Sequence, residues 1–214
     1  MSNNIYIIGA GGHGQVVLDA LLKSGISPAG FLDDNISQGK KVSGITVLGN
    51  ITLAKELKGK FVIAIGDNSA RKKIADFLSF PNDRYFTVIH PSAILSENVK
   101  VGNGSMIIGG AVINTEAIIG EHTIINTSVS VDHHNVIGDF VHIAPGAHTG
   151  GNVIVEEGAF VGLGCSIIPG KEIGKWAVVG AGAAVISNVP DYSVSVGVPA
   201  KVIKRKANIK NRKM

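Results

Sequence analysis

A six-residue repeat that begins at Ala93 constrains the fold of this chain more than any other feature of its sequence. When the chain is divided into hexads from that residue, the third position is Leu, Val or Ile in fifteen of sixteen hexads, without an insertion over 96 residues. The sixteen third positions are Leu95, Val101, Ile107, Ile113, Ile119, Ile125, Val131, Ile137, Ile143, Thr149, Val155, Val161, Ile167, Ile173, Val179 and Val185. A constant period over this length indicates a repeat architecture, and it argues against a sandwich of β-hairpins, which would need hairpin turn dipeptides.

Each hexad fits a short strand followed by a bend. Alternate side chains of a strand point to opposite faces, so one aliphatic residue per hexad can point inward while the small residue at the first position fits the corner. The fourth position is often glycine, which tolerates the backbone angles of a bend. Three hexads close one triangular coil of 18 residues, and the sixteen hexads give about five coils stacked at roughly 4.8 Å. An aromatic content of 5% suits such a narrow prism.

Residues 5–85 follow a different pattern, in which strand-like and helix-like stretches alternate. These stretches occur in the order 5–8, 15–23, 30–34, 52–57, 61–66 and 69–78. The first, third and fifth are short apolar runs, as expected of buried parallel strands. The alternation predicts a small parallel α/β domain with about three strands.

Both halves of the chain carry motifs of a known family. Hexads such as Ala117–His122, preceded by the segments Ile7–Gly14, Gly30–Asp34 and Ile63–Asn68, resemble the sugar O-acyltransferase family related to sialic acid O-acetyltransferases. That family includes bacterial enzymes that N-acetylate amino groups on nucleotide-linked sugars. The resemblance covers residues 4 to about 205. It implies a homotrimer that binds acetyl-CoA as co-substrate in the groove between adjacent β-helices.

The resemblance also implies a division of the chain into three parts. Residues 1–88 would form a Rossmann-like domain that binds the nucleotide-sugar acceptor. Residues 89–205 would form the left-handed parallel β-helix of the hexapeptide acyltransferases, and residues 206–214 would be a basic tail.

The glycines at positions 9, 11 and 14 fit the dinucleotide-binding pattern G-x-G-x-x-G between a strand and a helix. An acidic residue about 20 positions on, which that reading needs, is supplied by Asp33 or Asp34. However, about three strands make only half of a dinucleotide fold, and a tight strand–helix turn is a simpler alternative. A helix N-terminus can also bind the phosphates of a nucleotide sugar. On the family resemblance, the expected acceptor contacts are Gly11, Gly12, His13, Asp33, Asp34, Asn68 and Arg71.

The segment Asp132–Asn135 places a histidine pair between an aspartate and an asparagine within the repeat. Acyl transfer needs a base for the proton of the acceptor and donors for the developing oxyanion. The family has its general base at the position of His133, which makes His133 and Asp132 the expected catalytic residues. Many members have an acid directly after this histidine, whereas this chain has His134. The partner that orients His133 is therefore left open between Asp132, Asp139 and a water molecule.

Coil geometry relates other residues to His133. Gly151 follows by 18 residues, one full coil, and should lie directly above it at roughly 4.8 Å. The resemblance assigns to an amide of this region the role of a donor to the thioester carbonyl. His142 follows His133 by half a coil and so belongs to another face, where it could meet the acetyl-CoA end if a neighbouring subunit supplies the other side of the site. The remaining expected coenzyme contacts are Leu163, Gly180, Ala181, Pro199 and Lys201.

Other compositional features narrow the function. The only cysteine, Cys165, occupies a small-residue corner position and is interpreted as packing. The histidines within the repeat fall at different hexad phases, so no metal site is expected. Seven of the basic residues lie in 201–214, which contains no acid, so the rest of the chain has a net charge of −3 although the whole has +4. We therefore expect no nucleic acid partner.

The combined prediction is a cytoplasmic, acetyl-CoA-dependent acetyltransferase acting on an amino or hydroxyl group of a nucleotide-linked sugar, by direct transfer without a covalent enzyme intermediate. No membrane insertion is expected, because the N-terminus lacks an apolar run long enough for a signal or a span. Three alternatives remain at this point. They are a non-enzymatic β-helix scaffold, an O-acetyltransferase of a free or polymer-linked sugar, and an NAD-dependent protein.

Overall fold

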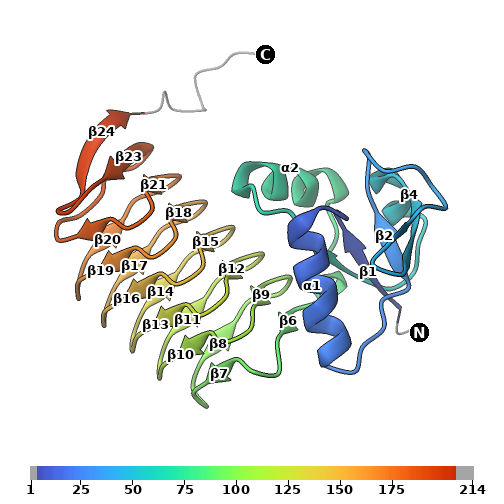
Figure 1. The fold of residues 1–214 in the computed structure, drawn as a ribbon, viewed down its shortest axis with the longest axis horizontal. Helices are drawn as coiled ribbons and strands as arrows, with labels where there is room; N and C mark the ends of the chain where they lie inside the picture. The colour runs from blue at the N-terminus through green and yellow to red at the C-terminus, as the bar shows by residue number, and fades with distance from the viewer. Residues whose placement is uncertain (1–3, 206–214) are drawn as a thin grey trace.

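The computed structural model describes residues 4–205, in which an α/β unit precedes a parallel β-helix (Figure 1). The α/β unit contains a five-stranded sheet in the order β3-β4-β2-β1-β5. Its elements are β1 (Ile5–Ile8), α1 (Gly12–Lys23), β2 (Gly30–Leu32), β3 (Lys41–Val42), β4 (Ile45–Gly49), η1 (Ile51–Lys55), β5 (Lys60–Ile63), α2 (Asn68–Leu78) and η2 (Asn82–Arg84). The strands β1, β2, β4 and β5 are parallel, as predicted for buried apolar runs joined by crossovers.

The sequence analysis missed two strands of this sheet. β3 and β4 form an antiparallel hairpin around Ser43 and Gly44, whose φ angles of 47° and 84° are those of a type I′ turn. The prediction of about three strands was therefore wrong. The helix expected over residues 52–57 is a 3-10 helix at Ile51–Lys55 instead. The hairpin and the 3-10 helix are both short, and their hydrophobic pattern is too weak to distinguish them from a loop in the sequence.

The repeat forms three parallel sheets. Neighbouring strands of each sheet are hydrogen-bonded to each other and are 18 residues apart in the sequence. One sheet consists of β7 (Ile94–Leu95), β10 (Val112–Ile113), β13 (Ser130–Val131), β16 (His148–Thr149), β19 (Ser166–Ile167) and β22 (Ala184–Val185). The second consists of β8 (Lys100–Val101), β11 (Ile118–Ile119), β14 (Val136–Ile137), β17 (Ile154–Val155) and β20 (Glu172–Ile173). We name them the β13 sheet and the β14 sheet.

The third sheet, named here the β15 sheet, extends beyond the hexads at both ends. It consists of β6 (Val88–Ile89), β9 (Met106–Ile107), β12 (Ile124–Ile125), β15 (His142–Ile143), β18 (Phe160–Val161), β21 (Val178–Val179), β23 (Ser193–Val196) and β24 (Lys201–Arg205). The last strand is antiparallel to β23. From Ile107 to Val185 every third position of a hexad is buried, which confirms the inward-facing aliphatic column.

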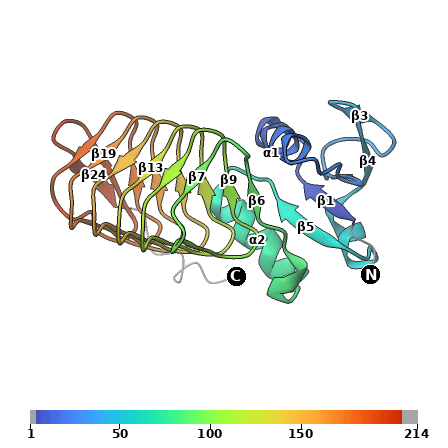
Figure 2. The ribbon, with the colours of Figure 1, turned by 90° about the horizontal axis from the view of Figure 1, so that it is seen from below.

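The α/β unit packs against the outer face of the β15 sheet at its first coils (Figure 2). The outward side chains Val88, Met106 and Ile124 form one buried cluster with Val17 and Leu18 of α1 and with residues of the α/β sheet. Because β6 already pairs with β9 of the β-helix, the expected boundary at residue 88 falls within a β-helix strand. The three-part division of the chain stays a prediction, and the expected basic tail, 206–214, lies outside the described residues.

Candidate functional site

The glycine-rich loop between β1 and α1 is a tight turn. Gly9 has a φ of +97°, and a Cβ at position 14 would overlap the carbonyl oxygen of Gly9, so both positions require glycine. Gly11 and Gly12 are exposed, and a Cβ at either would meet nothing. The loop therefore presents an open helix N-terminus, where backbone N–H groups can meet an anion.

The two acids after β2 hold backbone near this loop. Oδ2 of Asp33 accepts from the amide of Ala10 at 2.8 Å, and its Oδ1 accepts from Asn35. Oδ1 of Asp34 accepts from the amide of Ile51 at 2.9 Å. Each carboxylate thus accepts one or two hydrogen bonds from the backbone of the α/β unit. Asp33 is partly exposed and Asp34 is exposed, so their remaining lone pairs can meet a ligand.

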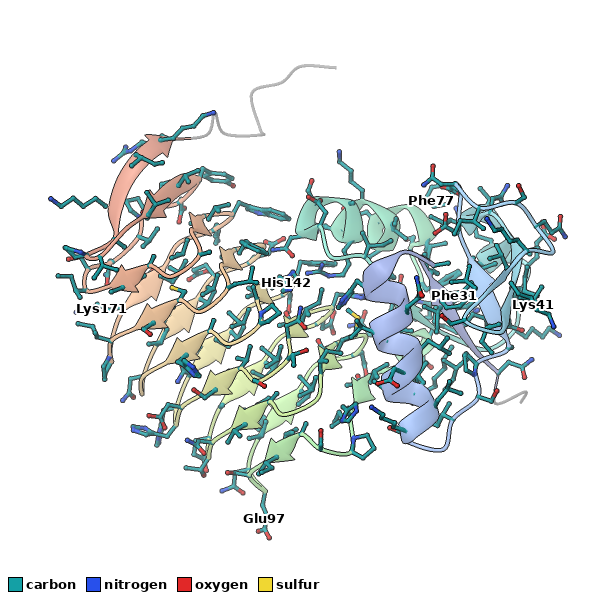
Figure 3. The ribbon with its side chains drawn as sticks, viewed as in Figure 1. Phe31, Lys41, Phe77, Glu97, His142 and Lys171 are labelled. Atoms are coloured by element: carbon teal, nitrogen blue, oxygen red, sulfur yellow. The ribbon has the colours of Figure 1, made fainter. Side chains whose placement is uncertain are left out.

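His142 lies where the coils face the α/β unit (Figure 3), and its ring centroid is 6.1 Å from that of His13 in α1. Burial lowers the pKa of both to about 4, and the positive charge of the neighbouring Arg71 acts in the same direction. Both imidazoles are therefore neutral at pH 7. The Nε2 atom of His13 is buried and has no hydrogen-bond partner within residues 4–205.

Both ring nitrogens of His142 are occupied within the chain. Nδ1 lies 3.1 Å from the carbonyl oxygen of Gly66, which can only accept, so Nδ1 carries the hydrogen. Nε2 lies 3.0 Å from Nδ2 of Asn126, an amide whose orientation is fixed because its Oδ1 accepts from the backbone N–H of Thr127. His142 is only 8% exposed. It can meet the acetyl group only after giving up one of these bonds, so its expected coenzyme contact stays a prediction.

Asn126 is a polar residue of this region that the sequence analysis missed. It follows the buried third position Ile125, where nothing in the hexad pattern distinguishes it from a solvated corner residue. The residue 16 positions on, His142, is the signal that could have found it, because that spacing is close to one coil of 18 residues.

The structure corrects the expectation for Arg71 and Asn68. Arg71 has no exposed surface, and its guanidinium donates to the carbonyl groups of Ile65, Gly66, His122, Phe140 and Val141 and to Oδ1 of Asn68. Asn68 in turn donates to the carbonyls of Gly158 and Ala159. Neither side chain is free to contact a sugar diphosphate, so the expected role was wrong. They bind α2 to the coils instead.

His133 lies in the turn between β13 and β14, at an exposed corner of the β-helix. The predicted stacking on Gly151 is confirmed, because a Cβ at position 151 would overlap Cε1 and Nε2 of the His133 ring. The backbone N–H of Gly151 has no acceptor within residues 4–205. An unused amide donor thus lies beside the imidazole.

Neither of the two candidate acids is hydrogen-bonded to the His133 ring within residues 4–205. Oδ1 of Asp132 accepts from Nδ2 of Asn114 at 2.9 Å and from the backbone N–H of His133 at 2.8 Å, and these hydrogen bonds hold its pKa below the usual range. Asp139 accepts from the amide of Glu121. The His133 ring is hydrogen-bonded to His134, with the two Nδ1 atoms 3.0 Å apart. Of the three partners left open, the two acids thus make no hydrogen bond to the His133 ring, and the expected catalytic role of Asp132 stays a prediction.

The expected coenzyme contacts lie along a different corner, between the β15 and β13 sheets. Leu163, Ala181 and Pro199 are separated by 18 residues each, and all three are exposed. The backbone N–H of Gly182 donates to the carbonyl of Leu163, as stacking of successive coils requires. Gly180 is half-buried beside this line, and Lys201 is exposed at the start of β24.

Comparison with known proteins places these features in a family. The sequence profile of the PglD N-terminal domain matches residues 4–78. GDP-perosamine N-acetyltransferase of Escherichia coli is 32% identical over 94% of this chain and 97% of that protein. UDP-N-acetylbacillosamine N-acetyltransferase of Bacillus subtilis is 42% identical over 49% of this chain, which is 51% of that protein.

Solved structures agree with these relatives. A histidine-to-alanine variant of GDP-perosamine N-acetyltransferase from Caulobacter crescentus, in complex with CoA and GDP-perosamine, superposes with a TM-score of 0.88 at 34% identity, over 95% of this chain and 98% of that chain. The acetyltransferase domain of PglB from Neisseria gonorrhoeae, in complex with acetyl coenzyme A, gives a TM-score of 0.88 at 32% identity, over 95% and 100% of the two chains.

This chain belongs to the PglD-like hexapeptide-repeat family of nucleotide-sugar N-acetyltransferases.

Membership of the PglD-like family decides between the alternatives left open by the sequence. The chain is an acetyl-CoA-dependent N-acetyltransferase of nucleotide-linked amino sugars, which confirms the predicted activity and selects N- over O-acetylation. The readings as a non-enzymatic scaffold and as an NAD-dependent protein were wrong. Coenzyme A or acetyl coenzyme A is bound in the solved relatives, in agreement with the expected co-substrate.

The remaining expectations for this PglD-like chain concern absences. No helix within residues 4–205 is both long enough and apolar enough to cross a membrane. Over the same residues no three His, Cys, Asp or Glu side chains are grouped as metal ligands would be. Cys165 is fully buried, and burial raises the pKa of its thiol to about 11. A neutral, inaccessible thiol is unsuited to nucleophilic attack.

Proposed function

We propose that this enzyme acetylates the amino group of a nucleoside diphosphate-linked sugar, with His133 as general base, at sites formed between the subunits of a homotrimer. The observation that carries the proposal is the exposed imidazole of His133 resting on Gly151, beside an amide N–H without a partner. A base and a hydrogen-bond donor within one coil step are the two groups that thioester aminolysis requires.

In the proposed reaction His133 Nε2 accepts the proton of the amine as its nitrogen bonds to the thioester carbonyl carbon. The Gly151 N–H donates to the carbonyl oxygen as negative charge develops there. The C–S bond then breaks, and the proton held by His133 passes to the sulfur, so the products are the N-acetyl sugar and CoA. The buried Cys165 takes no part, which is consistent with direct transfer.

The acceptor is proposed to lie between the glycine-rich loop and the His13–His142 contact. Gly11 and Gly12 offer open backbone N–H groups at the N-terminus of α1, which suit the diphosphate. The unpartnered Nε2 of His13 and the free lone pairs of Asp33 and Asp34 can contact the rest of the acceptor. GDP-perosamine, which the Caulobacter crescentus relative binds, is the first acceptor to test.

Acetyl-CoA is proposed to follow the line Leu163, Ala181 and Pro199. Two further members of the same 18-residue series, Thr127 and Pro145, extend the line to Asn126 and His142. The four coil steps from Thr127 to Pro199 span roughly 19 Å at about 4.8 Å per step, a length suited to a thin linear arm. Gly180 lets this arm approach the backbone, and Lys201 can attract the phosphates.

A trimer is proposed because the two halves of the site lie on different corners of one chain. His133 belongs to the corner between the β13 and β14 sheets, whereas the line that ends at His142 belongs to the corner between the β15 and β13 sheets. A neighbouring copy can bring them together. The outer face of the β14 sheet supports such contact, because Ile118, Val136 and Ile154 form an exposed apolar ladder one coil apart.

The first experiment compares His133→Ala with wild type, using acetyl-CoA, GDP-perosamine and other nucleotide amino sugars, with CoA thiol release as the readout. We expect kcat to fall by about 10²–10⁴-fold while acetyl-CoA binding, measured by calorimetry, is retained. His148→Ala is the matched control, since this exposed histidine of strand β16 contacts Ser130 and no expected substrate. Near-normal turnover of a folded His133→Ala enzyme would sink the proposal.

A second experiment tests whether the sites are shared between subunits. Inactive His133→Ala and His13→Ala subunits are mixed under conditions of subunit exchange. If one subunit supplies His133 and its neighbour supplies His13, random mixing restores about a quarter of the sites. Absence of any recovery, or a monomer in sedimentation equilibrium, would contradict the shared site.

A further inference from the structure

His133 and His134 are consecutive residues whose rings share one hydrogen bond. Their Nδ1 atoms are 3.0 Å apart, their ring centroids are 5.2 Å apart, and their planes are nearly perpendicular at 85°. Two neutral imidazoles can make this bond only if one Nδ1 carries a hydrogen and the other does not. The two rings must therefore be in opposite tautomers.

Only one of the two arrangements allows His133 to act as a base. If Nδ1 of His133 carries the hydrogen and donates it to His134, then Nε2 of His133 keeps its lone pair, and the Cε1–Nε2 edge of the ring lies against Gly151. If His134 donates instead, Nε2 of His133 carries a hydrogen and cannot take the proton of the amine. The state of His134 thus decides whether the base is competent.

The surrounding residues leave this task to His134. Asp132 is bonded to Asn114 and to backbone, and Asn135 donates to the carbonyls of Asp132 and Gly150. Within residues 4–205, His134 is the one side chain that hydrogen-bonds the His133 ring.

We propose that His134 is a positioning residue, whose neutral imidazole accepts the Nδ1 hydrogen of His133 and so holds the general base in its competent tautomer. This inference rests on the function proposed above. His134 itself does not touch the substrates in this assignment. It does the work of a carboxylate partner without carrying a negative charge.

A neutral partner has a measurable consequence for the pH dependence. A charged acceptor would stabilise the imidazolium of His133 more strongly than a neutral imidazole does. In addition, protonation of His134 turns both of its nitrogens into donors, which ends its acceptance from His133. Activity should therefore fall on the acid side with the loss of two protonation-sensitive groups and with a slope steeper than that of a single group.

The charged and titratable groups around the pair come from three coils. Asp132 lies in the same turn, and Glu116 occupies the corner position of His134 one coil earlier, where it accepts from Asn98. On the following coil His148 is bonded to Ser130, and the residues next to the pair, Gly151 and Asn152, are uncharged. In the three position-134 variants below these groups stay constant, so a change in their acid limb reports on position 134, and the His148→Ala control shows what the loss of His148 alone does.

The variants are chosen to fit the backbone at this position. His134 has a φ of +58°, in the left-handed region that Gly, Asn and Asp tolerate best. His134→Gly removes the acceptor. His134→Asn offers a neutral amide oxygen close to the place of Nδ1, and His134→Asp offers a carboxylate oxygen there.

The experiment measures kcat, both KM values and the pH profile of kcat/KM for these variants, with His148→Ala as control and thermal unfolding as a check on folding. We expect His134→Gly to lower kcat by about 10- to 100-fold, part of the 10²–10⁴-fold that a positioned base contributes, with KM little changed. His134→Asn should recover most of this loss. His134→Asp should recover it and move the acid limb to higher pH with the slope of a single group.

Two results would overturn the proposal. One is a His134→Gly enzyme with wild-type kcat and acid limb, and the other is a failure of both His134→Asn and His134→Asp to improve on His134→Gly. A ¹⁵N NMR spectrum of histidine-labelled wild type adds a direct test, because His133 must carry its hydrogen on Nδ1. His133→Ala distinguishes failure of the proposed function from failure of the role proposed for His134. If His133→Ala stays active, the proposed function fails. If His133→Ala is inactive while the His134 variants keep full activity, only the role of His134 fails.

Discussion

Five of the seven histidines of this protein lie in two contrasting places. At the corner between β13 and β14, His133 and His134 are exposed and are bonded to each other. At the junction between the α/β unit and the coils, His13, His122 and His142 are largely covered, and burial lowers the pKa of each to about 4. The same side chain is exposed to solvent in one place and is buried and held neutral in the other.

The difference shows how the fold divides its tasks. The junction contains the fully buried Arg71, which donates to no carboxylate within residues 4–205, so neutral histidines around it avoid repulsion between buried charges. His122 stacks on Phe140 at 5.0 Å and meets Tyr85 edge-on at 4.3 Å, as a packing aromatic would. In the proposed function, the junction fixes the position of the glycine-rich loop, while the corner carries out the chemistry.

The largest effect is expected from removing the centre of the junction. Arg71→Ala removes the donor of the Ile65, His122 and Phe140 carbonyls and of the Asn68 amide oxygen. The carbonyls of Gly66 and Val141 lose one of two donors. We expect the free energy of unfolding to fall by about 3–5 kcal/mol, as measured in urea at pH 7. Arg71→Lys keeps the charge and can reach fewer acceptors, so it should lose less. A loss below about 1 kcal/mol for Arg71→Ala would show that the junction does not depend on this side chain.

The second prediction concerns acid, and it distinguishes the junction histidines from those of the corner. Because burial favours the neutral imidazole, the unfolded chain binds more protons than the folded chain between pH 6.5 and about 4. The stabilisation is therefore complete above pH 6.5 and is lost as the pH falls towards 4. Each junction histidine should lower the free energy of unfolding by about 1 kcal/mol between pH 7 and pH 5.5, so the three together should lower it by about 3 kcal/mol.

The matched variant for this test is His122→Phe. Nδ1 of His122 has no hydrogen-bond partner in the described part of the chain, and its ring lies within an aromatic stack, so phenylalanine fits the site. Urea titrations at several pH values should show about two thirds of the wild-type acid slope for His122→Phe and the full slope for His148→Ala. An equal slope for His122→Phe and wild type would contradict the assignment.

The third prediction disturbs the corner without touching its histidines. In Gly151→Ala the added Cβ overlaps the His133 ring, and the backbone of Gly151 is not among the left-handed positions, so alanine brings no strain of its own. The ring must turn away. We expect kcat to fall by about 10²-fold, which corresponds to about 2.7 kcal/mol in activation free energy, with the urea midpoint nearly unchanged. Wild-type turnover in steady-state assays would show that the ring position does not matter.

The sequence predicts the coils well because one short-range rule generates them. The third position of each hexad points inward wherever a coil has neighbours above and below, so the 18-residue stacking of Gly151 on His133 follows from spacing alone. The exception is informative: Leu95 and Val101, in the first coil, are only half-buried. The first coil has a neighbouring coil on one side only, so its third positions are less covered than the repeat predicts.

The contacts between distant segments could not be read from that rule. Arg71 follows a buried strand at the first turn of a helix, a place typical of phosphate-binding residues, and only the docking of α2 onto the coils reveals that its donors are used internally. Asp132 likewise stands next to the expected base in sequence, yet its carboxylate faces Asn114 of the preceding coil. Adjacent positions on a corner point in different directions, which spacing does not encode.

The smallest effect is expected at the rim of the junction, where Lys72, like Arg71, connects α2 to the coils of the β-helix. Its Nζ lies 3.4 Å from Asp76, 3.6 Å from Glu157 and 4.9 Å from the centre of the Phe140 ring. The three charged side chains are each one third or more exposed, so water screens their attraction. In addition, the long lysine side chain loses conformational freedom when it is held in one position. Lys72→Ala should lower the free energy of unfolding by no more than about 0.5 kcal/mol in the urea titration used for Arg71→Ala. Because the two residues are neighbours on α2 and bridge to the same coils, a loss for Lys72→Ala that approached the loss for Arg71→Ala would mean that proximity to the coils, rather than burial of the donors, determines the strength of the junction.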